Sequence, residues 1–257
     1  MGLVKPKHFV YHRNVNVISA LTTIAGLLAD QSRARMVEKL LDGEAKTATE
    51  LALHAGISAQ TASAHLAKLT SVALLECKTE GRCRYYRLAG PGVAEAFEAL
   101  TVLVPRTKKT DGEAEDREDL WPIRLARTCY DHLAGRVGVA VTNAMVRRRH
   151  LVPGRRDFRL TRPGETFLSE LGVDVERARR QRRVFARQCV DWTERRPHLA
   201  GALGAALATR SFELDWLARV PDHRHLVITA KGRSGLARVF RLKPALWLPT
   251  PSGVPSI

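Results

Sequence analysis

The chain has 257 residues, 45% of them hydrophobic, and a formal net charge of +16. This hydrophobic share is ample for the packed cores of one or two domains. No stretch approaches the roughly 20 apolar residues of a membrane span, and no apolar segment follows the N-terminal basic residues as in a secretory signal. We therefore expect a cytoplasmic protein without a membrane partner, whose four cysteines are reduced.

The first strong pattern along the chain is that of two short helices joined by a tight turn. Thr47 and Glu50 have the spacing of a capping box, which satisfies free amides at a helix start. Gly56 can turn the chain sharply after this helix, and Ser58 is a good N-cap for the next one. We predict a helix-turn-helix whose second helix spans residues 58–70.

The second helix is predicted to have one apolar and one polar face. Ala62, Leu66 and Leu69 recur at i, i+4 and i+7, so they form a single apolar stripe. The other face would lie in a DNA major groove, together with Ser58 at the helix start. We expect this face to read bases through four side chains and to hold a phosphate through Lys68. The base-reading side chains are Gln60, Thr61, Ser63 and His65.

A β-hairpin is predicted directly after the second helix. Residues 74–78 and 84–88 favour strands and bracket Thr79-Glu80-Gly81, which we interpret as the loop. Basic side chains near the tip would neutralise phosphates beside the groove, which fixes register but carries little sequence information. These side chains are Lys78, Arg82 and Arg84. A tip that is merely solvated is the alternative, although a neighbouring helix-turn-helix favours phosphate contact.

Two cysteines flank this hairpin, and its register decides whether they can meet. A three-residue loop at 79–81 places Cys77 opposite Cys83 on one face, whereas a two-residue loop at 80–81 places them on opposite faces. Glu is unfavourable at positive φ, so we predict the three-residue loop. Opposed cysteines could form a redox switch that loosens DNA binding on oxidation, or could simply pack across the strands.

Four ordered segments now carry a resemblance to a known family. LADQSRAR (28–35), TELA (49–52), ISAQTASAHL (57–66) and EGRCRYYRL (80–88) resemble the winged-helix repressors of the ArsR/SmtB type, over about the first 105 residues. The resemblance implies a homodimer that binds near-palindromic double-stranded operator DNA and is released by an inducer. It also implies that the first and last helices of the domain join the dimer, which would be residues 17–28 and 93–104.

The same resemblance leaves the inducer open. Metal-sensing members commonly carry a Cys-rich motif on the helix before the recognition helix, or paired acidic and His ligands on the last helix. In this sequence residues 50–54 contain no Cys, and residues 91–104 contain no His or Cys. Any sensing must therefore use other residues.

Composition divides the rest of the chain. We predict an N-terminal arm (1–12), the winged domain (13–105), a charged linker (106–119), an Arg-rich helical domain (120–245) and a tail (246–257). Residues 120–257 hold 26 basic and 11 acidic residues, so most of the excess positive charge lies outside the winged domain. This charge would add salt-sensitive attraction to phosphates, or would belong to solvated helix faces.

The predicted second domain contains an internal similarity. The block that begins at Cys129 and includes HLAGRVG is matched by the block that begins at Cys189 and includes HLAGALG, after five inserted residues (193–197). Each block is followed by a helix-like run and then by an alternating strand, at 158–161 and at 226–229. We predict two degenerate helix-helix-wing units packed as a pseudo-symmetric pair.

The similarity places two Cys-His pairs in matching positions. Across the pseudo-twofold they could converge on a soft metal, because thiolate and imidazole ligands together suit Zn²⁺, Cd²⁺ or Pb²⁺. Asp131 and Asp191 could join or orient these ligands. The alternative is that the cysteines act as small buried hydrophobes and that the Asp/His pairs cap or bridge helices. The candidate ligands are Cys129, His132, Cys189 and His198.

These features favour a fold that is mainly α with small β-hairpin wings, in the α+β class. No Gly-rich phosphate loop, nucleophile elbow or acidic metal cluster occurs in the sequence, so we do not expect an enzyme. The predicted function is a sequence-specific transcriptional regulator, a dimeric repressor released by a soft metal or a small molecule. A thiol-based redox repressor and a non-inducible DNA-packaging or plasmid-maintenance protein are the alternatives.

Overall fold

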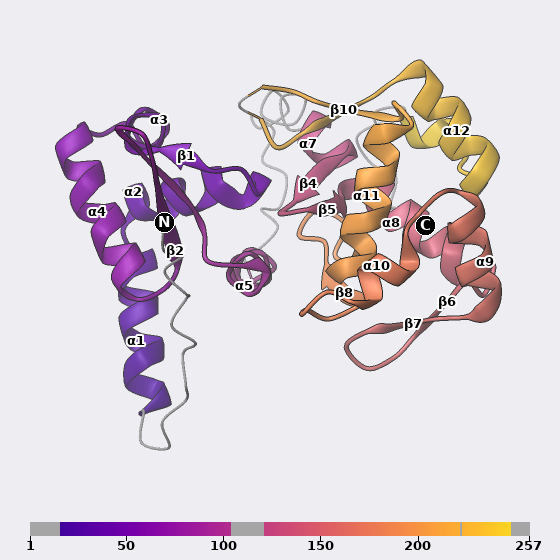
Figure 1. Cartoon of the computed structure of the whole chain (residues 1–257), viewed down its shortest axis with the longest axis horizontal. Helices are drawn as coiled ribbons and strands as arrows, with labels where there is room; N and C mark the ends of the chain where they lie inside the picture. The colour runs from indigo at the N-terminus through magenta and orange to yellow at the C-terminus, as the bar shows by residue number, and fades with distance from the viewer. Residues whose placement is uncertain (1–15, 104–120, 222, 248–257) are drawn as a thin grey trace, which may run out of the picture. The chain divides into compact units, whose positions relative to one another are not determined.

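The computed structural model describes residues 16–103, 121–221 and 223–247 (Figure 1). The predicted arm (1–12) and linker (106–119) lie outside these residues, as does residue 248 onward of the predicted tail. By its contacts the chain divides into two compact units, the first made of Met1–Leu40 and Ala45–Ala89, the second of Leu41–Glu44 and Gly90–Ile257. Among the described helices, none combines the length and the apolar character needed to cross a membrane.

The first unit consists of short helices and one small sheet. Its elements in chain order are α1 (Val17–Leu28), α2 (Gln31–Lys39), β1 (Lys46–Thr47), α3 (Ala48–Ala55), α4 (Ala59–Ser71), β2 (Leu75–Glu80) and β3 (Cys83–Leu88). A 3-10 turn (Leu40–Asp42) follows α2. The strands form an antiparallel sheet in the order β1-β3-β2. These elements form a helix-turn-helix followed by a hairpin wing, as predicted.

Local sequence explains the ends of α3 and the start of α4. The Thr47 side chain accepts from the Glu50 amide while the Glu50 carboxylate accepts from the Thr47 amide, so the predicted capping box is present. Gly56 ends α3 in the left-handed conformation with φ of 69°, which a glycine adopts without steric cost. Ser58 then caps α4 by accepting from the Thr61 amide. The turn between the two helices is therefore fixed by three residues of the right type.

The predicted apolar stripe of α4 lies in the core of the first unit. Ala62, Leu66 and Leu69 are fully buried. Helix α1 contrasts with α4, since none of its residues is buried and the apolar side chains of Val17, Ile18 and Leu21 are exposed. An exposed apolar helix of this kind is typical of an interaction surface.

Beyond Leu41–Glu44, the second unit consists of α5, α7 and two similar halves. The first elements are α5 (Pro91–Thr101) and α7 (Trp121–Leu125). Repeat 1 contains β4 (Arg127–Cys129), β5 (His132–Ala134), α8 (Gly135–Arg147), β6 (Leu151–Pro153), β7 (Phe158–Leu160) and α9 (Arg162–Glu170). Helix α10 (Val175–Arg179) connects it to repeat 2. Repeat 2 contains β8 (Arg187–Val190), β9 (Pro197–Ala200), α11 (Gly201–Glu213), β10 (Leu217–Arg219), β11 (Leu226–Ile228) and α12 (Ala230–Phe240), and a 3-10 turn (Pro244–Trp247) follows it.

Each repeat is a hairpin, a helix, a second hairpin and a second helix. The strands predicted at 158–161 and 226–229 are present as β7 and β11. The helix-helix-wing order was wrong, because the Cys-His blocks form the hairpins β4-β5 and β8-β9 rather than helices. Glycines at matching positions explain the close packing of both repeats. A Cβ at Gly138 would lie 2.4 Å from the Leu133 carbonyl oxygen, and one at Gly204 2.5 Å from that of Leu199.

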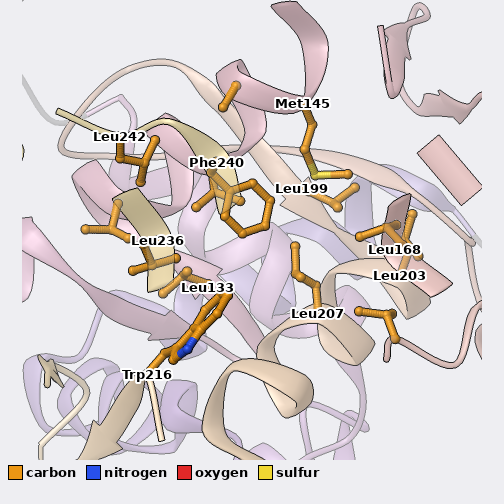
Figure 2. Close-up of a cluster of buried hydrophobic side chains, with 14 of the residues drawn as sticks. Leu133, Met145, Leu168, Leu199, Leu203, Leu207, Trp216, Leu236, Phe240 and Leu242 are labelled. Atoms are coloured by element: carbon orange, nitrogen blue, oxygen red, sulfur yellow. The ribbon is translucent and has the colours of Figure 1, made fainter. Parts of the chain in front are cut away.

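The two repeats share one hydrophobic core (Figure 2). Leu133 and Met145 from repeat 1 and Leu203 and Trp216 from repeat 2 belong to the same buried cluster. Leu199 N–H also donates to the Thr142 hydroxyl at 2.8 Å, which joins β9 to α8 by a buried hydrogen bond. The repeats therefore fold as one unit, and this packing positions the Cys-His hairpins.

Candidate functional site

Most of the predicted base-reading face of α4 is accessible. Gln60, Thr61 and Ser63 are exposed, as is Lys68 near the end of the helix. The Ser63 hydroxyl donates to the Ala59 carbonyl at 2.9 Å, so its oxygen can still accept a hydrogen bond. Ser58 and Thr61 are linked at 2.8 Å between their hydroxyl oxygens. A helix N-terminus with short polar side chains of this kind suits contact with base edges or phosphates.

His65 lies differently from this expectation. Its side chain is only 14% exposed, and its Nδ1 lies 3.1 Å from Arg33 Nη1. Arg33 itself donates to the Leu27 carbonyl, so His65 belongs to a contact between α4 and the α1–α2 junction. A base-reading role was predicted from helical spacing alone, which could not show that Arg33 draws the ring inward.

The wing register differs from the predicted one. Glu80 pairs with Cys83 and Cys77 with Tyr86, so the loop is Gly81-Arg82 rather than 79–81. Gly81 has φ of 61° at the first loop position, as the two-residue type II′ turn requires. Cys77 and Cys83 consequently point to opposite faces of the wing, since alternate residues of a strand face opposite ways. The predicted opposition of these two cysteines, on which a redox switch in the wing depended, was wrong.

The wing tip keeps basic side chains on its surface. Arg82 and Arg84 are exposed, while Lys78 Nζ lies 2.5 Å from Glu80 Oε1. Because Glu80 offsets the charge of Lys78, the two arginines provide the stronger positive potential at the tip. An exposed ion pair of this kind contributes little energy and can exchange for a phosphate contact.

A second group of candidate residues lies in the second unit. Cys129 pairs with His132 across hairpin β4-β5, and Cys189 pairs with His198 across hairpin β8-β9. Directly opposed residues of an antiparallel pair project from the same face, so each hairpin presents one thiol and one imidazole side by side. All four side chains are buried, and one ligand atom from each lies within 4.8 Å of all the others. We name these four residues the Cys2His2 cluster.

The distances within the Cys2His2 cluster resemble those of a tetrahedral metal centre. The two sulfur atoms lie 3.9 Å apart, and Nε2 of His132 lies 3.1 Å from Nε2 of His198. Zinc bonds of about 2.3 Å to sulfur and about 2.05 Å to nitrogen imply ligand separations of about 3.8 Å and about 3.3 Å in a tetrahedron. The residues present therefore fit a four-coordinate soft metal without large movement.

Each imidazole of the Cys2His2 cluster has a carboxylate on its outer side. Asp131 Oδ1 lies 3.3 Å from His132 Nδ1, and Asp191 Oδ2 lies 3.9 Å from His198 Nδ1. A carboxylate behind the distal nitrogen orients a metal-bound histidine through Nε2, as in many metal sites. His198 Nδ1 is buried and has no hydrogen-bond partner, so a small approach to Asp191 would complete this arrangement.

Asp191 is the more deeply embedded of the two carboxylates. It is fully buried, and its Oδ2 accepts from Arg127 Nη2 at 2.9 Å and from the Gly135 amide at 2.7 Å. Its Oδ1 accepts from the amide and the hydroxyl of Thr193. Although burial opposes ionisation, the adjacent Arg127 guanidinium keeps the pKa of Asp191 well below its usual range. This aspartate therefore ties the β8-β9 turn to the start of α8.

Burial and neighbouring groups together set the protonation of the Cys2His2 cluster without metal; although burial opposes it, Cys129 and Asp131 raise the pKa of His132 to about 9. The hydrogen bond between Cys129 and Cys189, which stabilises the protonated Cys129 thiol, and burial raise the pKa of Cys129 well above its usual range. Burial, assisted by the neighbouring His132, lowers the pKa of His198 well below its usual value. A neutral imidazole is ready to bind metal, whereas a thiol must first release its proton. Metal binding here would displace protons.

Sequence reasoning missed the residues that support this cluster. Arg127 is fully buried two residues before Cys129, and Arg183 forms an ion pair with Asp131. Thr193 caps the turn that Asp191 begins. The Asp-x-Thr spacing is a turn signal that could have been recognised, whereas the partners of Arg127 and Arg183 lie far away in sequence and leave no local pattern.

Comparisons with known proteins agree with the geometry of the first unit. A helix-turn-helix domain family matches residues 28–78. An uncharacterized HTH-type transcriptional regulator of Bacillus subtilis, YdfF, is 42% identical over 224 residues, which cover 87% of this chain and 98% of YdfF. This likeness extends through both units.

Two solved structures are similar to the first part of the chain. The homodimeric winged helix-turn-helix domain of Mb0332 from Mycobacterium bovis, a possible ArsR-family regulator, is 28% identical and covers 38% of this chain and 94% of its own, with a TM-score of 0.33. The cadmium metal-sensor CmtR from Mycobacterium tuberculosis is 33% identical and covers 35% and 92%, with a TM-score of 0.29. The near full-length likeness to YdfF, together with the matched helix-turn-helix family, shows that the chain belongs to the HTH-type transcriptional regulators.

Proposed function

We propose that the protein is a dimeric repressor that occupies an operator in double-stranded DNA and leaves it when an inducer binds. The exposed polar face of α4 carries this proposal, because its core stripe is buried while Gln60, Thr61 and Ser63 stay available. Base edges are read by short polar side chains on such a helix, and Lys68 and the wing arginines would hold phosphates. The protein acts on DNA in the cytoplasm and performs no catalysis of its own.

Base reading and phosphate contact can be separated by mutation. Gln60→Ala should reduce the preference for operator over unrelated DNA, since a lost base contact costs about 1–3 kcal/mol only on the correct sequence. Arg82→Ala should weaken binding to both DNAs similarly and reduce the salt dependence by about one phosphate contact. Fluorescence anisotropy on both duplexes at several salt concentrations measures this. An equal loss on both DNAs for Gln60→Ala would contradict the division of roles.

The dimer is proposed to form through α1 and the exposed side of α5. Val17, Ile18 and Leu21 are exposed on α1, and Leu100 on α5 is 51% exposed. Burying exposed apolar surface of this kind is favourable by about 25 cal/mol per Å². Replacing Ile18 and Leu21 with Glu should yield monomers in analytical ultracentrifugation and reduce operator binding. A dimer that survives both substitutions would move the interface elsewhere.

We propose that the inducer is a soft metal ion held by the Cys2His2 cluster. Burial of all four ligands and the near-tetrahedral distances support this choice, and the thiolate-imidazole donor set suits Zn²⁺, Cd²⁺ or Pb²⁺. When bound, the ion would cross-link β4-β5 to β8-β9. Asp131 and Asp191 would hold the two imidazoles with Nε2 toward it.

The four cysteines of the chain supply a matched test of this inducer. Reduced protein bound to DNA from its own upstream region is titrated with Cd²⁺, Pb²⁺ and Zn²⁺. Release should be lost in Cys129→Ser and Cys189→Ser, and retained in Cys77→Ser and Cys83→Ser, whose side chains are exposed on the wing. Binding that is indifferent to every metal, or release that survives loss of Cys129 and Cys189, would reject a metal inducer at this cluster.

A further inference from the structure

We propose that the turn between Cys129 and His132 transmits metal binding to the winged helix through the segment Leu41–Glu44, with Glu98 of α5 as a second connection. The proposal rests on the function proposed above, since it concerns how the Cys2His2 cluster regulates DNA binding. It concerns repeat 1 specifically, because the contact with Leu41–Glu44 is made by the short turn of repeat 1, whereas a longer turn joins Cys189 to His198 in repeat 2.

The turn in question is short and strained. Tyr130 and Asp131 alone separate the two paired ligands of hairpin β4-β5. Tyr130 has φ of 62°, a left-handed conformation that costs a bulky residue free energy and persists only when its surroundings hold it. Any metal that changes the separation of Cys129 and His132 must therefore act directly on the backbone of this turn.

Leu41–Glu44 is the segment that holds the turn. The Tyr130 amide donates to the Leu41 carbonyl at 2.8 Å. Gly43, with φ of 81°, approaches so closely that a Cβ there would lie 2.8 Å from the Tyr130 carbonyl oxygen. The two backbones are therefore in contact with no side chain between them, and a shift of the turn cannot be absorbed by a flexible side chain.

This segment is continuous with the helix-turn-helix. By its contacts Leu41–Glu44 belongs to the second unit, yet it lies in the chain between α2 and β1. Only Ala45 separates it from β1, whose second residue, Thr47, caps α3. β1 also pairs with β3 of the wing. A displacement of Leu41–Glu44 would therefore reach the strand that orders both the first helix of the motif and the wing.

Helix α5 provides the second connection. Glu98 is buried and forms an ion pair with Arg224, whose guanidinium also donates to the Thr128 carbonyl next to Cys129. On the neighbouring turn of α5, Glu95 lies 3.0 Å from Arg187 of β8, the strand that carries Cys189. Helix α5 therefore contacts the β4-β5 hairpin through Arg224 and the β8-β9 hairpin through Arg187. It also follows the wing strand β3 directly in the chain.

Each connection is continuous in the chain with the winged helix and is joined to a ligand hairpin by a hydrogen bond or an ion pair. Coupling between two sites typically changes affinity by about 5–150-fold. The metal needs only to favour one arrangement of the ligand turn that is incompatible with the DNA-bound arrangement of β1 and α3. The elements involved have defined contacts, so the coupling can be broken without touching a metal ligand or a DNA-contacting side chain.

Gly43→Ala is the substitution that tests this route. The added Cβ forces the Leu41–Glu44 backbone away from Tyr130. Gly92→Ala on α5 is the matched control, because nothing lies within 4 Å of its Cβ position. Full-length proteins are compared in two measurements, Cd²⁺ binding by the thiolate charge-transfer absorption and DNA affinity by anisotropy with and without Cd²⁺. Glu98→Gln repeats the test at the second connection should Gly43→Ala fail to fold.

The inference predicts that wild type and Gly92→Ala lose DNA affinity by a factor within about 5–150 when Cd²⁺ binds. Gly43→Ala should bind Cd²⁺ with the same absorption change while the DNA response falls toward a factor of 1, and Glu98→Gln should show a partial loss. A Gly43→Ala protein that responds as fully as wild type would overturn the route and leave the metal inducer intact. A wild type that binds DNA but shows no Cd²⁺ absorption or no response would overturn both.

Discussion

The two repeats of the second unit carry the same Cys and His ligands at corresponding positions but close their first hairpins differently. In repeat 1 two residues, Tyr130 and Asp131, join Cys129 to His132, whereas in repeat 2 the chain from Asp191 to Arg196 forms an internally bonded turn. The Cys and His of each hairpin nevertheless pair in the same way. A metal site between the repeats therefore requires that Cys and His stay directly opposed in both hairpins, whatever the length of the turn.

The difference in turn length separates two roles. The long turn of repeat 2 wraps around a buried carboxylate, Asp191, and so stabilises the unit internally. The short turn of repeat 1 leaves Asp131 partly exposed, and the backbone of Tyr130 in this turn contacts Leu41–Glu44. In the proposed route, repeat 2 is therefore the fixed side of the cluster and repeat 1 the side that transmits metal binding.

The largest expected effect distinguishes the two aspartates. Asp191→Asn leaves the fully buried Arg127 without its anionic partner, which should destabilise the protein by about 3–5 kcal/mol. Asp131→Asn removes an ion pair whose carboxylate is 30% exposed, and should cost less than about 1 kcal/mol. Urea unfolding followed by tryptophan fluorescence measures both. Comparable losses for the two variants would show that the repeats are equally rigid.

The next effect should be the same in both repeats. Gly138→Ala and Gly204→Ala each place a Cβ against a backbone carbonyl, at 2.4 Å and 2.5 Å. The hairpin must then separate from its helix, at a cost of about 1–3 kcal/mol in each case. Thermal unfolding compares the two variants, with Gly92→Ala as a control in open space. A large difference between the stability losses of the two variants would mean that the hairpin and helix are not packed in the same way in the two repeats.

The sequence allowed the winged helix-turn-helix to be predicted in detail because its signals are local. A capping box, a glycine after α3 and a 13-residue helix with an apolar stripe all lie within short windows. The wing register was missed because both predicted loops ended at Gly81, whereas the two-residue loop begins at Gly81. A glycine first in a two-residue loop is a type II′ signal that was available in the sequence.

The Cys2His2 cluster was predicted as a set of residues but not as a structure. Internal similarity located the four ligands, since repetition is visible without knowing the fold. The hairpins that present them are three or four residues per strand, too short for a periodic pattern. They are stabilised by Asp191 and Arg127, which lie 64 residues apart, so no local signal could reveal them.

The smallest expected effect comes from a position at which the repeats differ chemically. His150 and Trp216 each follow a residue with positive φ and precede the second hairpin of their repeat. Burial, assisted by Arg148, lowers the pKa of His150 from its usual value of 6.5, so the folded ring takes up a proton only at a lower pH than the unfolded chain does. Between the pKa of His150 in the folded chain and its usual pKa, the unfolded chain binds a proton that the folded chain does not. The free energy of unfolding therefore falls as the pH decreases through this range.

Substituting His150 isolates this contribution. His150→Phe keeps an aromatic ring against Phe167, whose centroid lies 4.3 Å from that of His150. The variant should match wild type near pH 8 and lose less stability than wild type as the pH falls from about 6.5 to 5. The gap between the two urea-unfolding curves should stay smaller than the cost of either glycine substitution. If the stability of wild type and of His150→Phe depended on pH in the same way, the His150 ring would be protonated equally in the folded and unfolded chains. Repeat 1 would then be as insensitive to pH at this position as repeat 2, which has Trp216 there.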